Sequence, residues 1–517
     1  FRYWHHFSGG RPTPDGKVVP YYFSGWEYSK DYKELTINLR KGLKWSHGVE
    51  LTSDDYIWWW ENYANNEILS PTPPEDWAPS LINVTKEGKY KVTFHYAKPV
   101  PNRYLTFNAT MGIHELAPRE FMKQFHPNFT DQEKLTELAE SVGLDTWDEY
   151  YDRVQDTSNF HPEYKHRRPT IRPYIPVKRT ETTFILERNP YYPFVDSEGN
   201  QLPYIDRIRI NLANSEEMAS TKAATGEATF GHWYLKTSDI PLYKKNEANE
   251  NFSTFIYQKS GGNEPFIKLN LSTENEKLKS IFLDDRFRKA LSLALDRDNI
   301  NEKVYYGHAT PRQMTVPPAS PYFEERFAKA YIEHDLEKSK QLLDEMGMVD
   351  INNDGFRETP EGEIFEPILI YCKYDIDPTK TLELVRKDFE EIGINIQIKM
   401  VSRGLHEKRW QSNNAEMGVW GPHGLLMGQF VKQRTSLGFL VPIAGGIVQD
   451  SAWPGWITWF DTKGEEGVEP PQEIKELNKY AEIAVSTFDE SKAAEALQKI
   501  LESQAKNIWT VGTVGMI

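Results

Sequence analysis

The residues best suited to do chemistry in this sequence lie in a short acidic loop. Its spacing fits D-x-N-x-D-G-x5-E, a pattern in which oxygen ligands surround a calcium ion. The ligands would be Asp350, Asn352, Asp354 and Glu361. A helix must follow such a loop, but Pro360 and the strand-like run 365–371 argue against one. We therefore favour a polar β-hairpin, with a structural calcium ion as the alternative.

Adjacent carboxylates occur as Asp54-Asp55, Asp284-Asp285 and Glu390-Glu391. Neighbouring residues on a helix or strand point apart, so these pairs fit helix caps and solvated surface better than acid-base catalysis. The sequence also lacks G-x-S-x-G, H-E-x-x-H and the P-loop pattern. We expect no enzyme activity. A glycoside-active enzyme stays as a remote alternative, because spacing alone does not show where two distant carboxylates converge.

Aromatic residues are the compositional outlier, with 15 Trp, 27 Tyr and 26 Phe. Such residues fill a large core or form stacking platforms in a binding cleft. The segment 453–459 carries Trp453, Trp456 and Trp459. Trp456 and Trp459 would share a helix face, and lobe packing is the better interpretation for Trp459. Trp453 and Trp456 stand beside Pro and Gly, so they are the better cleft candidates, with core packing as the alternative.

Length and charge limit the classes of function. A chain of 517 residues is expected to form two or three domains. The net charge of -15, with scattered Lys and Arg, disfavours a nucleic-acid partner. The single cysteine, Cys372, excludes an internal disulfide and a cysteine-rich metal site. The sequence has no apolar run of about 18 residues that would span a membrane, and its first residues do not resemble a signal peptide.

Hydrophobic periodicity predicts the elements that position these residues. Residues 34–39 and 91–96 alternate as half-buried strands. A helix is expected over 54–64, with a capped start at Thr52–Asp55. Its three adjacent tryptophans, 58–60, cannot share one face, so one or two should face a groove or another domain. Further helices are expected at 216–224, 285–294, 335–346, 379–392, 473–485 and 490–506. Extended segments between them, such as 266–271, 368–374 and 394–401, predict a mixed sheet covered by helices.

Seven weak motifs follow one another in a recognisable order. They include Leu39-Arg-Lys-Gly-Leu-Lys-Trp-Ser-His-Gly48, Arg188-Asn-Pro-Tyr-Tyr192, Leu202-Pro-Tyr-Ile-Asp206, Thr225-Gly-Glu227 and the helix Asp285–Arg297. Together they resemble the family 5 extracellular solute-binding proteins, the capture subunits of ABC importers for peptides, nickel and oligosaccharides. His47 departs from the pattern, since the family usually has Asp there, but either residue suits a turn.

The resemblance implies an α/β, two-lobed periplasmic-binding-protein-like fold (type II, cluster C) with an extra subdomain, truncated here at both ends. It implies four parts. Residues 1–170 would form the extra subdomain (II) with part of lobe I, 171–262 lobe I, 263–500 lobe III, and 501–517 a return strand to lobe I. Family members close two lobes on a hinge and bury the ligand between them.

The resemblance also implies where the ligand binds. Peptide-binding members use a Trp-x-x-Asp loop whose carboxylate meets the ammonium group of the peptide. Here Trp420 is kept and His423 replaces the Asp. A buried ammonium without its ion pair would cost about 3–5 kcal/mol. An indole and a neutral imidazole suit a hydroxyl-rich sugar better, unless both residues merely build the loop. His232, Trp233 and Tyr234 lie on a segment that runs towards the cleft floor in the family.

We therefore expect a substrate-binding protein of an ABC transporter that captures an oligosaccharide, with an oligopeptide or dipeptide as the alternative ligand. Its other partners would be the permease subunits, and it would need no cofactor apart from the calcium alternative. We expect a monomer in a bacterial periplasm or on the outer side of the cell membrane. A lipoprotein anchor would then lie in the missing N-terminal segment.

Overall fold

The computed structural model describes residues 9–13, 18–70, 81–99, 116–155, 168–231, 235, 237–257, 262–373, 377–421, 434–444 and 451–515. The chain forms two compact units, Phe1–Asn214 and Ser215–Ile517, which we describe separately. Their boundary falls inside the stretch 171–262 that we expected to form lobe I, and the four-part division remains a prediction.

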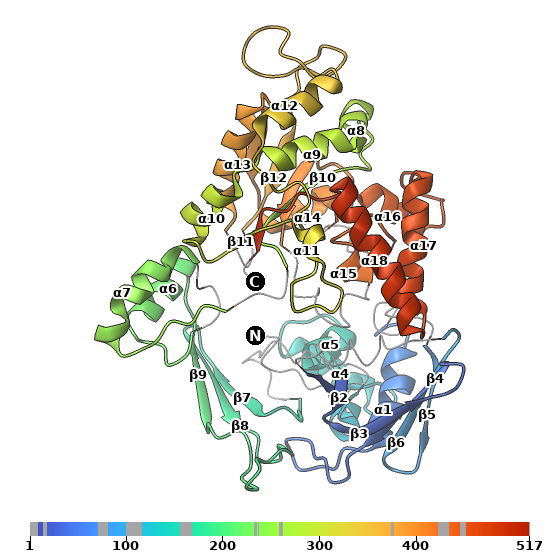
Figure 1. Cartoon of the computed structure of the whole chain (residues 1–517). Helices are drawn as coiled ribbons and strands as arrows, with labels where there is room; N and C mark the ends of the chain where they lie inside the picture. The colour runs from blue at the N-terminus through green and yellow to red at the C-terminus, as the bar shows by residue number, and fades with distance from the viewer. Residues whose placement is uncertain are drawn as a thin grey trace. The chain divides into compact units, whose positions relative to one another are not determined.

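The first unit is built on an antiparallel sheet with the strand order β3-β4-β6-β5 (Figure 1). Its strands are β3 (Phe23–Tyr28), β4 (Glu34–Leu39), β5 (Leu81–Glu87) and β6 (Lys91–Tyr96). Alternate residues of β4 face the core: Leu35 and Ile37 are fully buried, and Leu39 nearly so. The predicted strands at 34–39 and 91–96 are confirmed with their bounds.

The tryptophan triplet lies on the helix that covers this sheet. α1 (Ser53–Trp59) continues into a π-helical turn, η2 (Trp60–Ala64), so the predicted helix at 54–64 is confirmed. Trp58 and Trp59 are buried in a second core with Phe125 and Tyr151. Trp58 and Trp59 are therefore core residues, and half-buried Trp60 is the one member of the triplet for which the expected contact with a groove or another domain stays a prediction.

The remaining elements of the first unit are short. They are β1 (Gly10–Pro12), β2 (Val18–Pro20), α3 (Arg119–Met122), η3 (Lys123–Phe125), α4 (Gln132–Glu140), α5 (Trp147–Gln155), β7 (Tyr174–Arg179), β8 (Thr183–Arg188) and β9 (Arg207–Asn211). The last three strands form an antiparallel sheet, β7-β8-β9. Of the family motifs, 188–192 begins at the last residue of β8, and 202–206 directly precedes β9.

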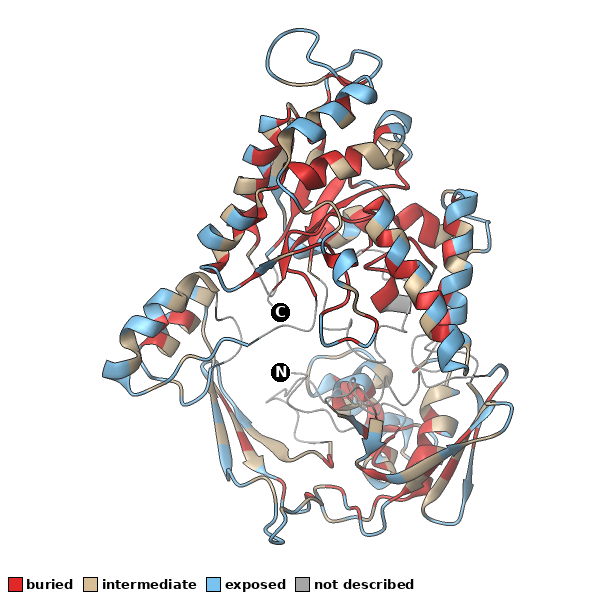
Figure 2. Cartoon of the chain, in the orientation of Figure 1, coloured by how far each residue is buried: buried red, intermediate tan, exposed pale blue. Residues whose placement is uncertain are grey.

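The second unit is centred on a mixed sheet of order β10-β14-β12-β13, whose strands are largely buried (Figure 2). The strands are β10 (Phe266–Leu269), β12 (Ile368–Tyr371), β13 (Gln397–Met400) and β14 (Met417–Trp420). β12 runs parallel to β13 and β14, and β10 runs antiparallel to β14. This arrangement confirms the mixed sheet expected from the alternation of helical and extended segments.

The rest of the second unit consists mainly of helices. They are α6 (Glu216–Ala224), η4 (Thr237–Asp239), α7 (Ile240–Glu250), α8 (Glu276–Leu283), α9 (Asp285–Ala294), α10 (Arg297–Tyr305), α11 (Glu325–Ala328), α12 (Leu336–Glu345), α13 (Thr379–Glu391), α14 (Arg403–Gln411), α15 (Arg434–Leu437), α16 (Pro454–Asp461), α17 (Gln472–Ser486) and α18 (Glu490–Asn507). The six helices predicted here are confirmed to within a residue or two at each end. No helix in the described ranges is both long and apolar enough to cross a bilayer.

The C-terminal segment is tied into the second unit. β15 (Val514–Gly515) pairs with β11 (Thr310–Pro311), and Val511 forms a bridge with Ile267. The structure shortens the return strand expected over 501–517, because Leu501 to Asn507 still belong to α18. A helix C-cap at Ile508, in the left-handed conformation, ends α18 and starts the extended segment.

Candidate functional site

A buried aromatic cluster lies between the sheet of the second unit and α14. Lys268 on β10 pairs with Gly418 on β14, and Trp410 of α14 packs over that pair. The Lys268 Nζ atom lies 3.8 Å from the centre of the Trp410 ring and 5.8 Å from that of Trp420. A Cβ atom on Gly418 would lie 2.9 Å from Trp410, so only glycine lets the indole lie this close to the strand.

His406 completes this cluster from the same helix. Its ring stacks on Trp420 with 5.3 Å between the centroids and 17° between the planes. Burial, together with the nearby cations Lys268 and Arg403, lowers the pKa of His406 to about 3. The imidazole is therefore neutral at physiological pH and carries one N–H donor and one bare nitrogen acceptor.

The segment before α16 contacts the cluster through a backbone carbonyl. The Ser451 carbonyl accepts a hydrogen bond of 3.2 Å from Lys268 Nζ. Trp453 is the N-cap residue of α16 and Trp456 lies in its first turn. The Gly455 N–H donates to Ser272 Oγ at 2.8 Å, which fixes the start of the helix beside β10.

Several polar atoms of this cluster are buried without a hydrogen-bond partner among the described residues. They are both ring nitrogens of His406 and the indole N–H groups of Trp410, Trp453 and Trp456. Indole N–H groups usually find an acceptor when buried, and an unmade hydrogen bond costs about 1–3 kcal/mol. His406 and Trp410 contribute such atoms beside Lys268 and Trp420, and Trp453 and Trp456 contribute them from the main hydrophobic core of the unit.

The structure brings together three of the residues predicted to bind ligand, Trp420, Trp453 and Trp456, in one buried core. Each side chain is at most 1% exposed, so their binding role remains a prediction. His423, His232, Trp233 and Tyr234 lie outside the described residues.

Sequence reasoning missed three members of the cluster, Lys268, His406 and Trp410. The spacing of His406 and Trp410, four residues apart, puts them on one face of a helix and was a usable signal. The position of Lys268 depends on how β10 pairs with β14, which the sequence does not show.

Comparison with known proteins places this chain in a family. Residues 17–426 match the description "Bacterial extracellular solute-binding proteins, family 5 Middle". The chain belongs to this family. The motif order found in the sequence is thereby confirmed, and so is the predicted fold class, the α/β fold of the two-lobed family 5 binding proteins.

Two kinds of relatives of this family 5 protein stand out. The periplasmic α-galactoside-binding protein of Rhizobium meliloti (strain 1021) is 24% identical over 96% of this chain and 69% of its own length. A solved oligopeptide-binding protein OppA is 28% identical, with a TM-score of 0.74 over 99% of this chain and 82% of its own. The binding protein MelB of Agrobacterium fabrum C58, solved with stachyose, is 21% identical, with a TM-score of 0.70 over 99% of this chain and 74% of its own. The chain spans 58–69% of the length of the curated relatives that it matches first.

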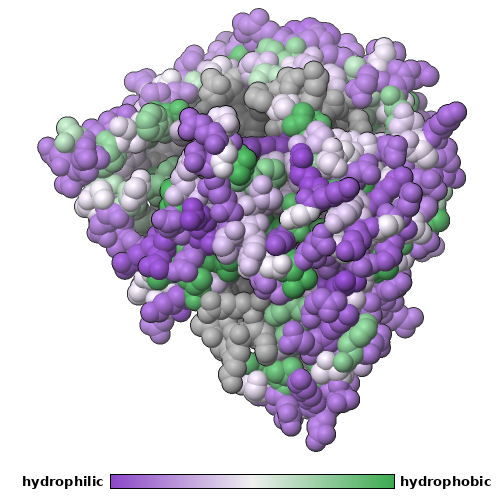
Figure 3. Space-filling view, turned by 90° about the horizontal axis from the view of Figure 1, so that it is seen from below, coloured by the Kyte–Doolittle hydropathy of each residue, from purple (hydrophilic) through white to green (hydrophobic). Residues whose placement is uncertain are grey.

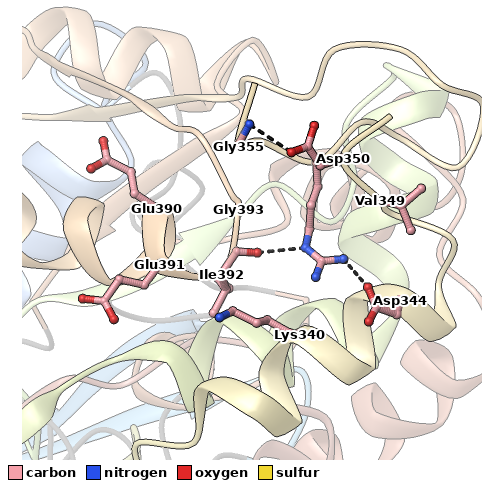
Figure 4. A pocket seen from close by; sticks show the side chains of 10 residues that line it. Lys340, Asp344, Val349, Asp350, Gly355, Glu390, Glu391, Ile392 and Gly393 are labelled. Carbon is pink, nitrogen blue, oxygen red and sulfur yellow. Dashed lines mark hydrogen bonds and ion pairs between the residues drawn. The ribbon is translucent and has the colours of Figure 1, made fainter. Parts of the chain in front are cut away.

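The acidic loop of this family 5 protein borders a separate pocket of about 240 Å³. Figure 4 shows Lys340 and Asp344 of α12 on one side of it and Glu390 and Glu391 of α13 on another. Arg357 crosses between them, donating to the Ile392 carbonyl at 2.9 Å and to Asp344 at 2.5 Å. The ion pair between Arg357 and Asp344 therefore helps to hold the walls of the pocket together.

The carboxylates of two predicted calcium ligands, Asp350 and Asp354, accept hydrogen bonds from backbone N–H groups of their own loop. Asp350 accepts the N–H groups of Asp354 and Gly355, at 3.2 and 3.0 Å, and Asp354 accepts the N–H of Phe356. A bridge between Glu358 and Ile364 forms a hairpin with Glu361 in its turn. Among the described residues no group of three His, Cys, Asp or Glu could hold a metal ion. These contacts favour the polar hairpin.

On the face drawn in Figure 3, the coloured residues do not separate into large hydrophilic and hydrophobic areas. Hydrophilic residues cover most of that face, and hydrophobic residues appear as separate spots among them. Such a mixture is typical of a protein surface in contact with water.

Proposed function

We propose that this chain is the ligand-capturing component of a bacterial ABC importer, and that its ligand is an oligosaccharide. The observation that carries the choice of ligand is the set of buried, unpartnered N–H groups and imidazole nitrogens that His406, Trp410, Trp453 and Trp456 contribute in the described part of the second unit. Sugar hydroxyl groups both donate and accept hydrogen bonds, so they would supply the partners that these atoms lack. Sugar rings also stack on indoles.

Charge also favours a sugar over a peptide. The two charged groups that act on His406 are Lys268 and Arg403, both cationic. The ammonium group of a peptide would be repelled by them, whereas a neutral sugar would not. The α-galactoside-binding relative, which aligns with 96% of the chain, supports the same choice. The OppA structure keeps oligopeptide as the second candidate.

The remaining features of the proposal follow from the family. The protein works outside the cytoplasmic membrane, as a monomer that delivers its ligand to permease subunits, and a lipoprotein anchor would hold it at the membrane. It releases the ligand unchanged. The cluster offers indole rings, a neutral imidazole and a lysine, which are groups suited to stacking and hydrogen bonding.

A panel of ligands tests the proposal. Thermal unfolding is followed with stachyose, with α- and β-linked oligosaccharides, and with di- to pentapeptides. We expect a saturable rise in melting temperature with a sugar and none with peptides. A rise with a peptide alone would overturn the choice of ligand. Mass spectrometry of the incubated sugar checks the absence of turnover, since cleavage products would contradict a binding protein.

A further inference from the structure

Three arginine side chains are buried in the described part of the second unit: Arg288, Arg297 and Arg312. Two of them are well satisfied. Arg288 donates from Nε to the Asn507 carbonyl at 2.9 Å and from Nη1 to the Phe282 carbonyl at 2.5 Å. Arg297 donates from Nε and Nη2 to the Gly512 carbonyl and from Nη1 to the Ser292 carbonyl. Both arginines thereby hold the C-terminal segment against α9 and α10.

Arg312 differs from these two. Its Nη2 donates to the Val316 carbonyl at 2.7 Å, but Nε and Nη1 are buried and have no partner among the described residues. The side chain is 1% exposed, and the centre of the Phe323 ring lies 5.8 Å from its Cζ atom. A buried guanidinium without a counter-charge is strongly unfavourable, because water no longer solvates the charge.

A second unpartnered donor lies three residues further along the chain. The hydroxyl of Thr315, which precedes the carbonyl contacted by Arg312, is buried without a hydrogen bond in the part of the chain that the structure describes. The loop from Arg312 to Val316 therefore carries, on two of its side chains, buried donors that the described residues leave unmatched. A carboxylate or oxyanion is the type of group that such donors bind.

The backbone keeps Arg312 in this position. Its N–H donates to the Thr513 carbonyl at 3.3 Å, where β11 meets β15. A Cβ atom on Gly515 would lie 2.8 Å from Arg312 Cδ. One on Gly262, which has a φ of 78°, would lie 2.3 Å from the Thr315 carbonyl. Burial lowers the pKa of Arg312 to about 10, so the side chain stays charged at neutral pH.

We propose that Arg312 and Thr315 form a binding site for a small oxyanion or a carboxylate, at the junction of β11 and β15. The anion supplies acceptors to Nε or Nη1 and to the threonine hydroxyl, and it neutralises the buried charge. This site is separate from the aromatic cluster and does not depend on the nature of the transported ligand.

The test compares the wild-type protein with R312M, which keeps the length of the side chain and removes the charge. Thermal unfolding is measured in sodium acetate and in sodium sulfate, at an ionic strength held constant with a bulky sulfonate buffer. We expect a saturable rise in melting temperature for the wild type, and an apparent dissociation constant raised by about tenfold or more in R312M. Without anion, R312M should melt at a higher temperature than the wild type, because the uncompensated charge is gone.

R326M is the matched control, since Arg326 is an exposed arginine paired with Glu324. It loses the same charge and should respond to anions as the wild type does. T315V removes only the hydroxyl and should weaken anion binding by a smaller factor. Parallel anion responses of the wild type, R312M and R326M would reflect a general salt effect and would overturn the proposal. A response to acetate but not to sulfate would identify the ligand as a carboxylate.

Discussion

The ammonium group of Lys268 lies 3.8 Å from the centre of the Trp410 ring, in a place where both side chains are fully buried. A desolvated cation over an indole is stabilised by about 2 kcal/mol. The contact exists because Gly418 lets Trp410 approach the strand, and it positions Trp420 and His406 on the same face of the sheet. Gly418 and Lys268 therefore determine how closely the aromatic rings of the cluster pack.

Replacing Gly418 should disturb the whole cluster. The new methyl group of G418A would meet Trp410 at 2.9 Å and the Ile370 carbonyl at 3.2 Å. We expect a loss of about 1–3 kcal/mol in the free energy of unfolding of the second unit, measured by denaturant. G404A is the control, because Gly404 is exposed on α14 and a Cβ atom there would have no neighbour within 4 Å. It should gain about 1 kcal/mol from helix propensity, and equal effects of the two changes would contradict the close packing.

Trp420 should matter for ligand binding more than Trp459 does. W420F keeps an aromatic ring against His406 but reduces the stacking surface and removes the indole N–H. We expect the affinity for the oligosaccharide selected by the thermal panel to fall about tenfold, equivalent to about 1.4 kcal/mol. Calorimetric titration measures it. W459F is the control, since Trp459 packs against Phe460 and Lys475. A loss of affinity in W459F but not in W420F would show that the ligand binds near Trp459 and not near Trp420.

The two neighbouring acids of α1 should respond to pH in opposite directions. Burial raises the pKa of Asp55 to about 6, above about 3.9 in an unfolded chain. Between about pH 4 and 6 the native state then binds more protons than the unfolded state, so the free energy of unfolding falls as pH rises, by about 3 kcal/mol in total. D55N should lose this fall across a pH series of denaturant unfolding.

Asp54 provides the control for that measurement. Its hydrogen bond with Lys86 lowers the pKa of Asp54, with Arg119 adding to the effect. Its contribution is therefore present at neutral pH and lost as pH falls through the lowered pKa. D54N should retain the fall in stability that Asp55 causes between about pH 4 and 6. If D54N and D55N had the same pH profile, Asp55 would not be the group responsible.

Arg297 should be essential for holding the C-terminal segment. R297M would leave the carbonyl groups of Gly512 and Ser292 buried without their donors. Hydrogen bonds to charged groups are worth about 1.5–3 kcal/mol, so we expect a loss of about 3 kcal/mol or more in denaturant unfolding. R326M serves again as the exposed control. A stability of R297M equal to that of the wild type would show that the segment is held by its strand pairing alone.

Calcium should have no effect on stability. The carboxylates of Asp350 and Asp354 accept backbone N–H groups of their own loop, and Glu361 lies in the hairpin turn. We expect the same melting temperature with calcium and with a chelator. A saturable rise with calcium that D350N abolishes would restore the calcium interpretation of the loop.

The sequence alone determined the longest helices, the strands at 34–39 and 91–96, and the family. Leu35, Ile37 and Leu39 alternate because every second side chain of β4 faces the core, and such a pattern is local enough to be recognised without a structure. Motif order identified the family for the same reason, since turns and helix caps depend on adjacent residues.

Only the tertiary structure decided which distant residues meet. Lys268 reaches Gly418 and Trp410 through the pairing of β10 with β14, and the order of strands in a sheet is not contained in the period of either strand. Similarly, nothing in the sequence distinguishes Arg312 from Arg288 and Arg297. Their different positions against the C-terminal segment leave one guanidinium without a full set of acceptors among the described residues, because burial removes the water that would otherwise supply them.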